Sequence, residues 1–198
     1  MNSDLKQLLK QEGNFNPSDS IIENFLEAME EIHLKPKERL IDYDRVNTDI
    51  FCLKEGIIRI FHIEEYREIT FGFATPGTII LSPHSYYVNS PAFLIAENCK
   101  TTATVLKMSK STFDSMLREY PEFSQWMFNL AMGQLYTCEH KLCLINGSAK
   151  DRYLSVLKNR PEIIEAVPGK ILASYLGVTP QYLCNLKSEL TNNIDKEK

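Results

Sequence analysis

The sequence has no hydrophobic run long enough to cross a membrane as a helix. Such a span needs about 20 consecutive apolar residues, and no segment of the 198-residue chain approaches that length. The amino-terminal segment carries charges of both signs and lacks the apolar stretch of a secretory signal peptide. Only five cysteines occur, an odd number at scattered positions, which indicates reduced thiols rather than a disulfide framework. We therefore expect a cytoplasmic protein without membrane contact.

The chain also has no large excess of positive charge. Its formal net charge is −4, which disfavours nucleic-acid binding by the molecule as a whole. From Gly147 onward, however, eight lysines and arginines stand against six aspartates and glutamates, a net charge of +2 that leaves −6 for the rest. Any affinity for DNA must therefore come from individually placed contacts and from dimerisation, because no broad basic surface exists.

The residue patterns that support catalysis or metal binding are missing as well. No His-x-His occurs, although a β-barrel metalloenzyme of the cupin type needs such a pair. Cys138-x-His140-x-x-Cys143 has the composition of a metal site, but positions 138 and 143 lie about 140° apart on a helix, so these side chains do not converge. We expect no metal, no cofactor and no enzymatic activity.

The distribution of apolar residues predicts three regions. An amphipathic helix follows Asn16-Pro17-Ser18. From Lys37 to Met108, short runs rich in β-branched and aromatic residues alternate with turn residues, a pattern typical of an antiparallel sandwich or small barrel. Helical periodicity returns at Ser111 and continues to the end, with helix breaks at Asn146-Gly147-Ser148 and Pro161.

A single apolar stripe runs along a predicted helix of about six turns that follows Pro121. Its near-heptad spacing suits a seam against a second copy of the chain, while another face packs on the sandwich. The residues predicted to form this dimer interface are Phe123, Met127, Leu130, Gln134, Cys138 and Leu142, with Ile145 continuing the stripe.

The stretch from Val167 to Leu190 predicts two short helices joined by a tight turn. Pro168 suits the first position of a helix, because proline has no N–H to lose there. Gly177 stands where the chain reversal needs a positive φ, which glycine adopts without strain. Thr179-Pro180 then supplies a hydroxyl N-cap and a proline at the first position of the second helix.

The second of these helices has one apolar and one polar face. Leu183, Leu186 and Leu190 face inward, and Gln181, Cys184, Asn185 and Ser188 face outward. This is the arrangement in which a helix-turn-helix unit presents a recognition helix to the major groove of DNA, and an ordinary α-helical hairpin gives the same pattern. The residues that we predict to contact DNA are Lys170, Thr179, Pro180, Gln181, Tyr182, Asn185, Lys187 and Ser188.

In the order of its regions, the chain resembles the Crp/Fnr family of bacterial transcription regulators. The matching segments are LKEGIIRIFHI, PGTII, CKTTATVLKMSKSTFDSMLREYP, KDRYLSVLKNRPEI and VPGKILASYLGVTPQYLCNLKSEL. The resemblance implies an α+β fold: an antiparallel β-roll or jelly-roll of the cyclic-nucleotide-binding type, a long dimerisation helix and an all-α helix-turn-helix domain. It places the sensor domain at residues 1–120, the dimerisation helix at 121–146 and the DNA-binding domain at 147–198. It further implies a homodimer with double-stranded DNA and RNA polymerase as partners.

The sequence departs from the cyclic-nucleotide binders of that family. Those proteins carry Gly-Glu after the Pro-Gly turn and Arg-Ser or Arg-Thr further on, whereas this chain has Leu81-Ser82-Pro83 and Ser90-Pro91-Ala92. A cyclic phosphate would be desolvated there without a charge partner. Two alternatives stay open: a pocket for an uncharged or aromatic effector, or a pocket filled by its own side chains. The residues available to it are Ser82, His84, Ser85, Tyr86 and Ser90.

Two further differences from the Crp/Fnr family bear on which kind of sensor or DNA-binding protein this chain is. The first cysteine is Cys52, so the amino-terminal cysteine cluster of the family's iron–sulfur sensors is missing. After Leu190 only TNNIDKEK remains, which is too short and polar for the β-hairpin wing that usually touches the DNA backbone. We therefore predict a DNA-binding regulator that does not respond to cyclic nucleotides. The alternative is a dimeric sensor that acts through protein contacts.

Overall fold

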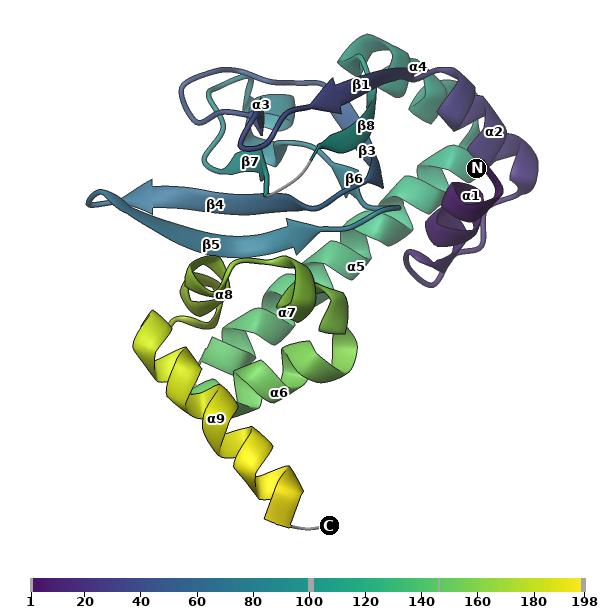
Figure 1. The fold of residues 1–198 in the computed structure, drawn as a ribbon. Coiled ribbons are helices and arrows are strands. Elements are labelled where there is room, and N and C mark those ends of the chain that lie inside the picture. The colour runs from purple at the N-terminus through teal and green to yellow at the C-terminus, as the bar shows by residue number, and fades with distance from the viewer. Residues whose placement is uncertain (1, 100–101, 146, 197–198) are drawn as a thin grey trace.

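The structure, a computed structural model, describes residues 2–99, 102–145 and 147–196. A β-sandwich occupies the first half of the chain, a long helix runs beside it, and a group of helices follows (Figure 1). No helix in the described residues is long and apolar enough to cross a membrane.

Eight strands among the described residues form two antiparallel sheets, with the orders β1-β8-β3-β6 and β2-β7-β4-β5. The strands are β1 (Glu30–Leu34), β2 (Arg39–Ile41), β3 (Ile50–Glu55), β4 (Ile58–Glu64), β5 (Arg67–Ala74), β6 (Ile79–Ile80), β7 (Ile95–Asn98) and β8 (Ala103–Met108). The turn between β3 and β4 depends on Gly56, whose φ is 102°. A Cβ atom there would lie 2.7 Å from that of Ala103, so only glycine lets these two segments approach.

The central strand β3 is buried on both faces, which explains its continuous apolar sequence. Phe51 and Leu53 point into the core between the two sheets. Ile50 and Cys52 point outward, into a second core that helices cover. Burial raises the pKa of the Cys52 thiol to about 12.

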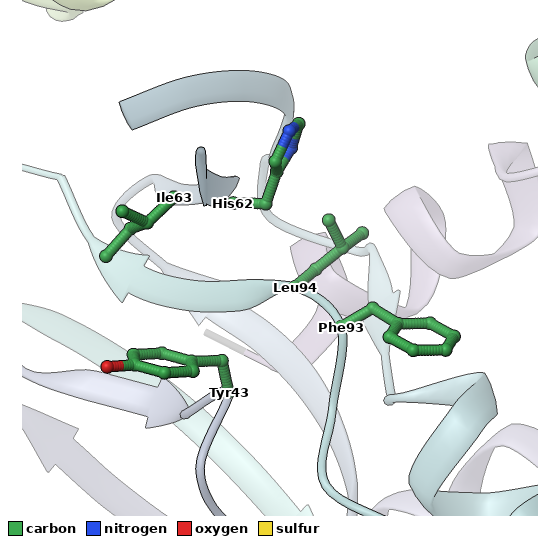
Figure 2. A pocket seen from close by; sticks show the side chains of 5 residues that line it. All are labelled: Tyr43, His62, Ile63, Phe93 and Leu94. Carbon is green, nitrogen blue, oxygen red and sulfur yellow. The ribbon is translucent and has the colours of Figure 1, made fainter. Parts of the chain in front are cut away.

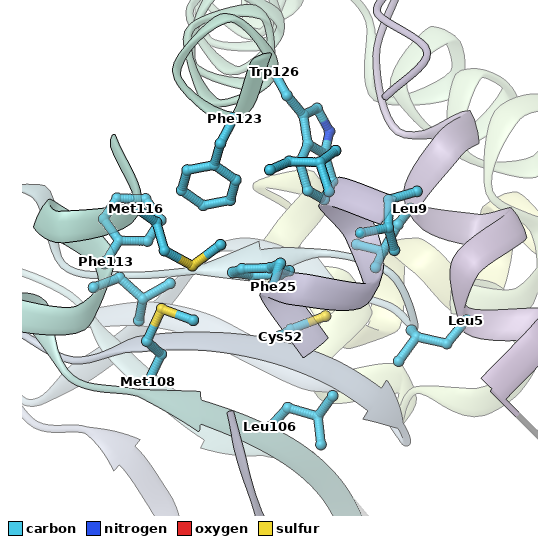
Figure 3. Close-up of a cluster of buried hydrophobic side chains, with 13 residues drawn as sticks. Leu5, Leu9, Phe25, Cys52, Leu106, Met108, Phe113, Met116, Phe123 and Trp126 are labelled. Carbon is cyan, nitrogen blue, oxygen red and sulfur yellow. The ribbon is translucent and has the colours of Figure 1, made fainter. Parts of the chain in front are cut away.

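Helices that precede and follow the strands in the sequence build this second core (Figure 3). They are α1 (Asn2–Gln11), α2 (Asp19–Glu27), α4 (Lys110–Glu119) and the amino-terminal part of α5 (Pro121–Ile145). Phe25 packs edge-on against Trp126, with 5.6 Å between ring centroids, and both side chains are fully buried. Ser18 caps α2 and also donates to Glu122 on α5, which fixes α2 against the start of the long helix.

The remaining helices form the carboxyl-terminal part of the molecule. They are α6 (Ala149–Asn159), α7 (Pro161–Ala166), α8 (Gly169–Leu176) and α9 (Pro180–Lys196). Ser148 and Asp151 form a capping box at the start of α6. A third core joins these helices and reaches Phe73 and Cys99 of the sandwich. In Figure 1, α7 and α8 lie directly beneath β5, and α9 lies farthest from the sheets.

The predicted fold class is confirmed: an antiparallel β-roll, a long helix and an all-α carboxyl-terminal unit. Local details differ. Pro161 begins the short helix α7 as well as following the end of α6, and Pro168 is the cap of α8, whose first residue is Gly169. The residue patterns did not predict β1, β7, α1 or the six-residue helix α3 (Pro83–Val88). Asn146, part of the predicted helix break, lies outside the described residues.

Candidate DNA-reading unit, dimer seam and effector region

The turn between α8 and α9 has the geometry that its sequence predicts. Gly177 adopts φ 65° and ψ 35°, in the left-handed region, and its N–H bonds to carbonyls of α8. Two residues later, the Thr179 hydroxyl accepts a hydrogen bond from the N–H of Tyr182, with 3.1 Å between the atoms, and caps α9. Pro180 is the first residue of that helix.

Arg152 of α6 binds the carboxyl-terminal end of α8, next to this turn. Its Nε donates to the carbonyl oxygen of Leu176, at 2.9 Å, and its Nη1 donates to that of Gly147, at 2.6 Å. One guanidinium therefore ties the last turn of α8 to the segment that precedes α6. No motif in the sequence singled out this residue, although a buried carbonyl at a helix end always needs a donor.

The inward and outward faces of α9 are as predicted. Leu183 and Leu186 are buried against α8 in the third core. Of the residues predicted to touch DNA, Lys170 lies on α8 and Thr179 just before α9, and the others lie on α9 away from its buried leucines. Exposed among them are Lys170, Thr179, Pro180, Gln181, Tyr182, Asn185 and Ser188, while Lys187 is half-buried. Gln181 and Asn185 adjoin each other, with 3.4 Å between Nε2 and Oδ1.

The predicted dimer stripe on α5 needs correction, because part of it is used inside the protomer. Phe123 is fully buried beside Trp126 and Phe25. Met127 and Leu130 are partly buried in the same core, and Gln134 is exposed. In the carboxyl-terminal half of α5, Lys141 still contacts β5, whereas Cys138 is half-buried and Leu142 is exposed.

A second row of apolar side chains on α5, which shares Cys138 and Leu142 with the predicted stripe, faces solvent. Phe128, Leu135 and Leu142 recur every seven residues and are 66%, 58% and 66% exposed. Ala131 and Cys138 stand between them at heptad spacing. At about 100° per residue, Phe128 and Leu135 lie roughly a quarter of a turn from the middle of the predicted stripe. Helical periodicity revealed an apolar helix but could not tell which of two neighbouring apolar rows the sandwich would cover.

The five residues predicted to line an effector pocket do not converge on one cavity. Ser82 is the N-cap of α3, and the Ser85 hydroxyl is fully buried without a partner in the described part of the chain. His84 donates through Nδ1 to the Pro91 carbonyl, at 2.8 Å, and stacks on Phe93. Ser90 is half-buried.

Tyr86 turns away from the others toward α4. Its hydroxyl bonds to Asp114, and the Lys110 ammonium lies 3.7 Å from the ring centroid. Burial and the bond to Asp114 raise the pKa of Tyr86 above its usual range. These contacts give Tyr86 a structural role between α3 and α4.

A cavity of about 520 Å³ lies beside this region, and Figure 2 shows the side chains around it. Its lining residues are Tyr43, His62, Ile63, Phe93 and Leu94. None of the predicted pocket residues lines it, although His84 touches Phe93 from outside. The lining contains no carboxylate, ammonium or guanidinium group. Among the described residues, no group of three or more potential metal ligands comes together.

Comparisons with known proteins agree with the fold and the order of the regions. The chain is 24% identical over 181 residues to the transcriptional activatory protein AadR of Rhodopseudomonas palustris, covering 84% of this chain and 72% of that protein. FixK2 of Bradyrhizobium japonicum superposes with a TM-score of 0.72 at 16% identity, over 83% of this chain and 85% of that one. The c-di-GMP-responsive regulator CLP of Xanthomonas campestris gives 0.69 at 15% identity, over 89% and 93%. No protein-family model matches the chain.

We call the pair α8–α9 with its glycine turn the candidate reading unit. The fold and this unit define a class, that of β-roll proteins with a carboxyl-terminal helix-turn-helix. The similarity to AadR, together with the structural likeness to FixK2 and CLP, confirms the resemblance to the Crp/Fnr transcription regulators.

Proposed function

We propose that this protein is a homodimeric transcription regulator that reads a palindromic DNA operator through α9. The observation that carries the proposal is the row of solvent-facing polar side chains on α9 above an intact glycine turn. Gln181 and Asn185 stand one helical turn apart, and their amides suit bidentate bonds to adenine N6 and N7. The helix amino terminus, Thr179 and Lys170 suit phosphate contacts.

The dimer is proposed to form along the exposed row Phe128, Ala131, Leu135, Cys138 and Leu142 of α5. Apolar side chains this exposed on a long helix gain about 25 cal/mol per Å² when a partner covers them. A parallel pair of α5 helices places two α9 helices on one side of the molecule. The operator then has two half-sites about one turn of DNA apart.

Selection from a random double-stranded DNA pool by the purified full chain tests the proposal. We expect enrichment of an inverted repeat. The matched control is the double variant Gln181→Ala/Asn185→Ala, which keeps the N-cap and the leucine face of α9 and should enrich nothing specific. If the wild-type chain enriches no sequence, DNA reading is excluded, and the alternative of a dimeric sensor that acts through protein contacts takes its place.

The protein is proposed to be neither an enzyme nor a cyclic-nucleotide sensor. In the α3 region, Ser82 caps the helix, and His84 and Tyr86 make internal contacts. An anionic cyclic phosphate buried there would lack the guanidinium that its desolvation requires. An effector, if the protein has one, is therefore expected to be uncharged.

A further inference from the structure

The strand β5 lies at the edge of its sheet, so one side of its backbone has no partner strand among the described residues. An exposed edge of this kind invites pairing with other chains unless it is covered. In this protein, side chains from three helical segments bond directly to that edge. The bonds link sequence positions 70 to 106 residues apart.

Ser174 of α8 occupies the first half of the edge. Its Oγ accepts from the N–H of Thr70, at 3.0 Å, and donates to the carbonyl of Glu68, at 2.8 Å. The Thr70 hydroxyl donates to the same Oγ, at 3.2 Å, and accepts from Arg59 Nε, at 3.0 Å. Arg59, which is 4% exposed, also pairs with Glu68 across 2.6 Å. The Ser174 hydroxyl thus makes the two hydrogen bonds, to the Thr70 N–H and the Glu68 carbonyl, that a neighbouring strand would otherwise make.

A β-bulge at Phe71 then turns new carbonyl groups toward the helices. Ile60 pairs with Gly72 and Phe61 with Thr70, so Phe71 has no partner on β4. Lys141 of α5 donates to the Phe71 carbonyl at 3.0 Å. A side chain at position 72 would approach Lys141 Nζ to within 3.4 Å, so Gly72 leaves room for this contact.

Arg160, between α6 and α7, binds the end of the strand. It donates through Nη1 to the Phe73 carbonyl, at 3.1 Å, and through Nη2 to the Thr75 hydroxyl, at 3.0 Å. Phe73 packs edge-on against Tyr175 of α8, with ring centroids 5.2 Å apart. Burial lowers the pKa of Lys141, whose ammonium lies over the rings of Phe71 and Tyr175.

We propose that Ser174, Lys141 and Arg160 are positioning residues that hold the reading unit on the edge of β5. Because Leu172 and Leu176 of α8 share one core with Leu183 and Leu186 of α9, the two helices move together. The position of α8 on β5 therefore sets the angle at which α9 meets DNA. The effect on DNA binding rests on the proposed function. The docking, meaning the contact of α8, Lys141 and Arg160 with the edge of β5, can be measured without DNA.

Amide hydrogen exchange of the full chain tests the docking. An edge-strand amide without a partner exchanges quickly, so protection of the Thr70 amide in the wild type reports the bond to Ser174. Ser174→Ala should speed its exchange about tenfold, the effect of one lost hydrogen bond. Ser174→Thr keeps the hydroxyl and should restore protection. Ser115→Ala, which alters a half-buried serine on the remote helix α4, should change nothing. An unprotected Thr70 amide in the wild type would overturn the docking.

The positioning role is tested with operators whose half-sites are moved apart or together by one or two base pairs. The wild type, with its reading unit held rigidly, should lose about tenfold in affinity for a one-base-pair shift, as for a mismatched base. Ser174→Ala should lose less than about threefold, because a loosened unit follows the moved half-site. A merely structural role would lower affinity for all spacings alike, and that result would overturn the positioning role. If no operator is selected at all, the proposed function fails and the positioning role with it, whereas the docking stands or falls on the exchange result alone.

Discussion

At the scale of single residues, three groups decide whether the reading unit forms. Gly177 supplies a left-handed backbone conformation, Thr179 caps the following helix, and Arg152 holds the last carbonyl of α8. Each role follows from backbone conformation or hydrogen bonding within the unit, so each can be tested by a single substitution.

Gly177→Ala should destabilise the protein by about 1 kcal/mol, because a Cβ atom is strained at φ 65°. Space is not the cause, since the nearest atom to a Cβ there lies 4.0 Å away. Gly169→Ala is the matched control: it lies in the first turn of α8 at an ordinary φ with nothing within 4 Å. Thermal denaturation should show a lower Tm for the first variant only. Equal Tm values would mean that the strain at position 177 is absent in solution.

The thiols should differ sharply in reactivity. Cys52 is fully buried and its pKa is raised to about 12, so almost no thiolate forms at pH 8. Cys143 and Cys184 are exposed. Under native conditions iodoacetamide should modify these two and leave Cys52 intact, and denaturation should make Cys52 react, as read by peptide mass spectrometry. Rapid native labelling of Cys52 would show that the helix layer over β3 opens.

The proposed function assigns Gln181 and Asn185 of α9 to base contacts and Lys187 to a phosphate contact. Gln181→Ala or Asn185→Ala should each cost about 1–3 kcal/mol of operator binding and relax preference at one base position. Lys187→Ala should weaken all sequences by similar factors and flatten the salt dependence. Titrations at several salt concentrations, against operator and scrambled DNA, separate the two outcomes. Unchanged binding by both amide variants would remove α9 as the reader.

At the scale of elements, α5 packs in its own protomer with one face and exposes apolar side chains on another. Its amino-terminal half belongs to the core of its own protomer through Phe123 and Trp126. A row of exposed side chains that begins at Phe128 and includes Leu135 runs along the rest of the helix. The helix therefore connects the β-roll to the proposed seam.

Leu135→Glu should yield a folded monomer. The substitution places like charges opposite each other across the two-fold axis, while Leu135 is 58% exposed and contributes little to the protomer. Leu154→Glu on α6, also at an exposed leucine, is the matched control and should stay dimeric. Sedimentation velocity gives the mass of each, and circular dichroism checks the fold. A dimer that survives Leu135→Glu would place the seam elsewhere.

At the scale of the whole molecule, the sandwich and the carboxyl-terminal helices meet along β5. The cavity of about 520 Å³ beside His62 and Phe93 lies at the other side of the β4–β5 pair from the strand edge, on the same continuous strands. The side chains around this cavity, and not only those of α3, therefore decide which ligand the β-roll could bind.

Cyclic AMP and cyclic GMP should not bind at micromolar concentration. The α3 region has no guanidinium for the phosphate and no carboxylate for the ribose hydroxyl. Isothermal titration calorimetry is the direct measurement, and a melting curve with saturating nucleotide should show no rise in Tm. Saturable heat with either nucleotide would show that the α3 segment rearranges to form a site.

Local features of this protein were predictable from its sequence. Turn and cap residues act on atoms within four positions of themselves, so Gly177, Thr179 and Ser148 marked their helix boundaries correctly. The apolar and polar faces of α9 followed from helical geometry in the same way. The elements that were missed gave weak signals: β1 is mostly exposed, and β7 and α3 are short.

The sequence by itself therefore determined the kinds of elements, their order and the chemistry of the reading helix, because these depend on neighbouring residues. Only the tertiary structure decided which apolar row of α5 faces solvent, where Tyr86 points and how α8 sits on β5. Those outcomes depend on contacts such as Thr70 with Ser174 and Ser18 with Glu122, each 104 residues apart. Periodicity carries no information about partners at such separations, since any apolar face can be covered by several others and packing selects one.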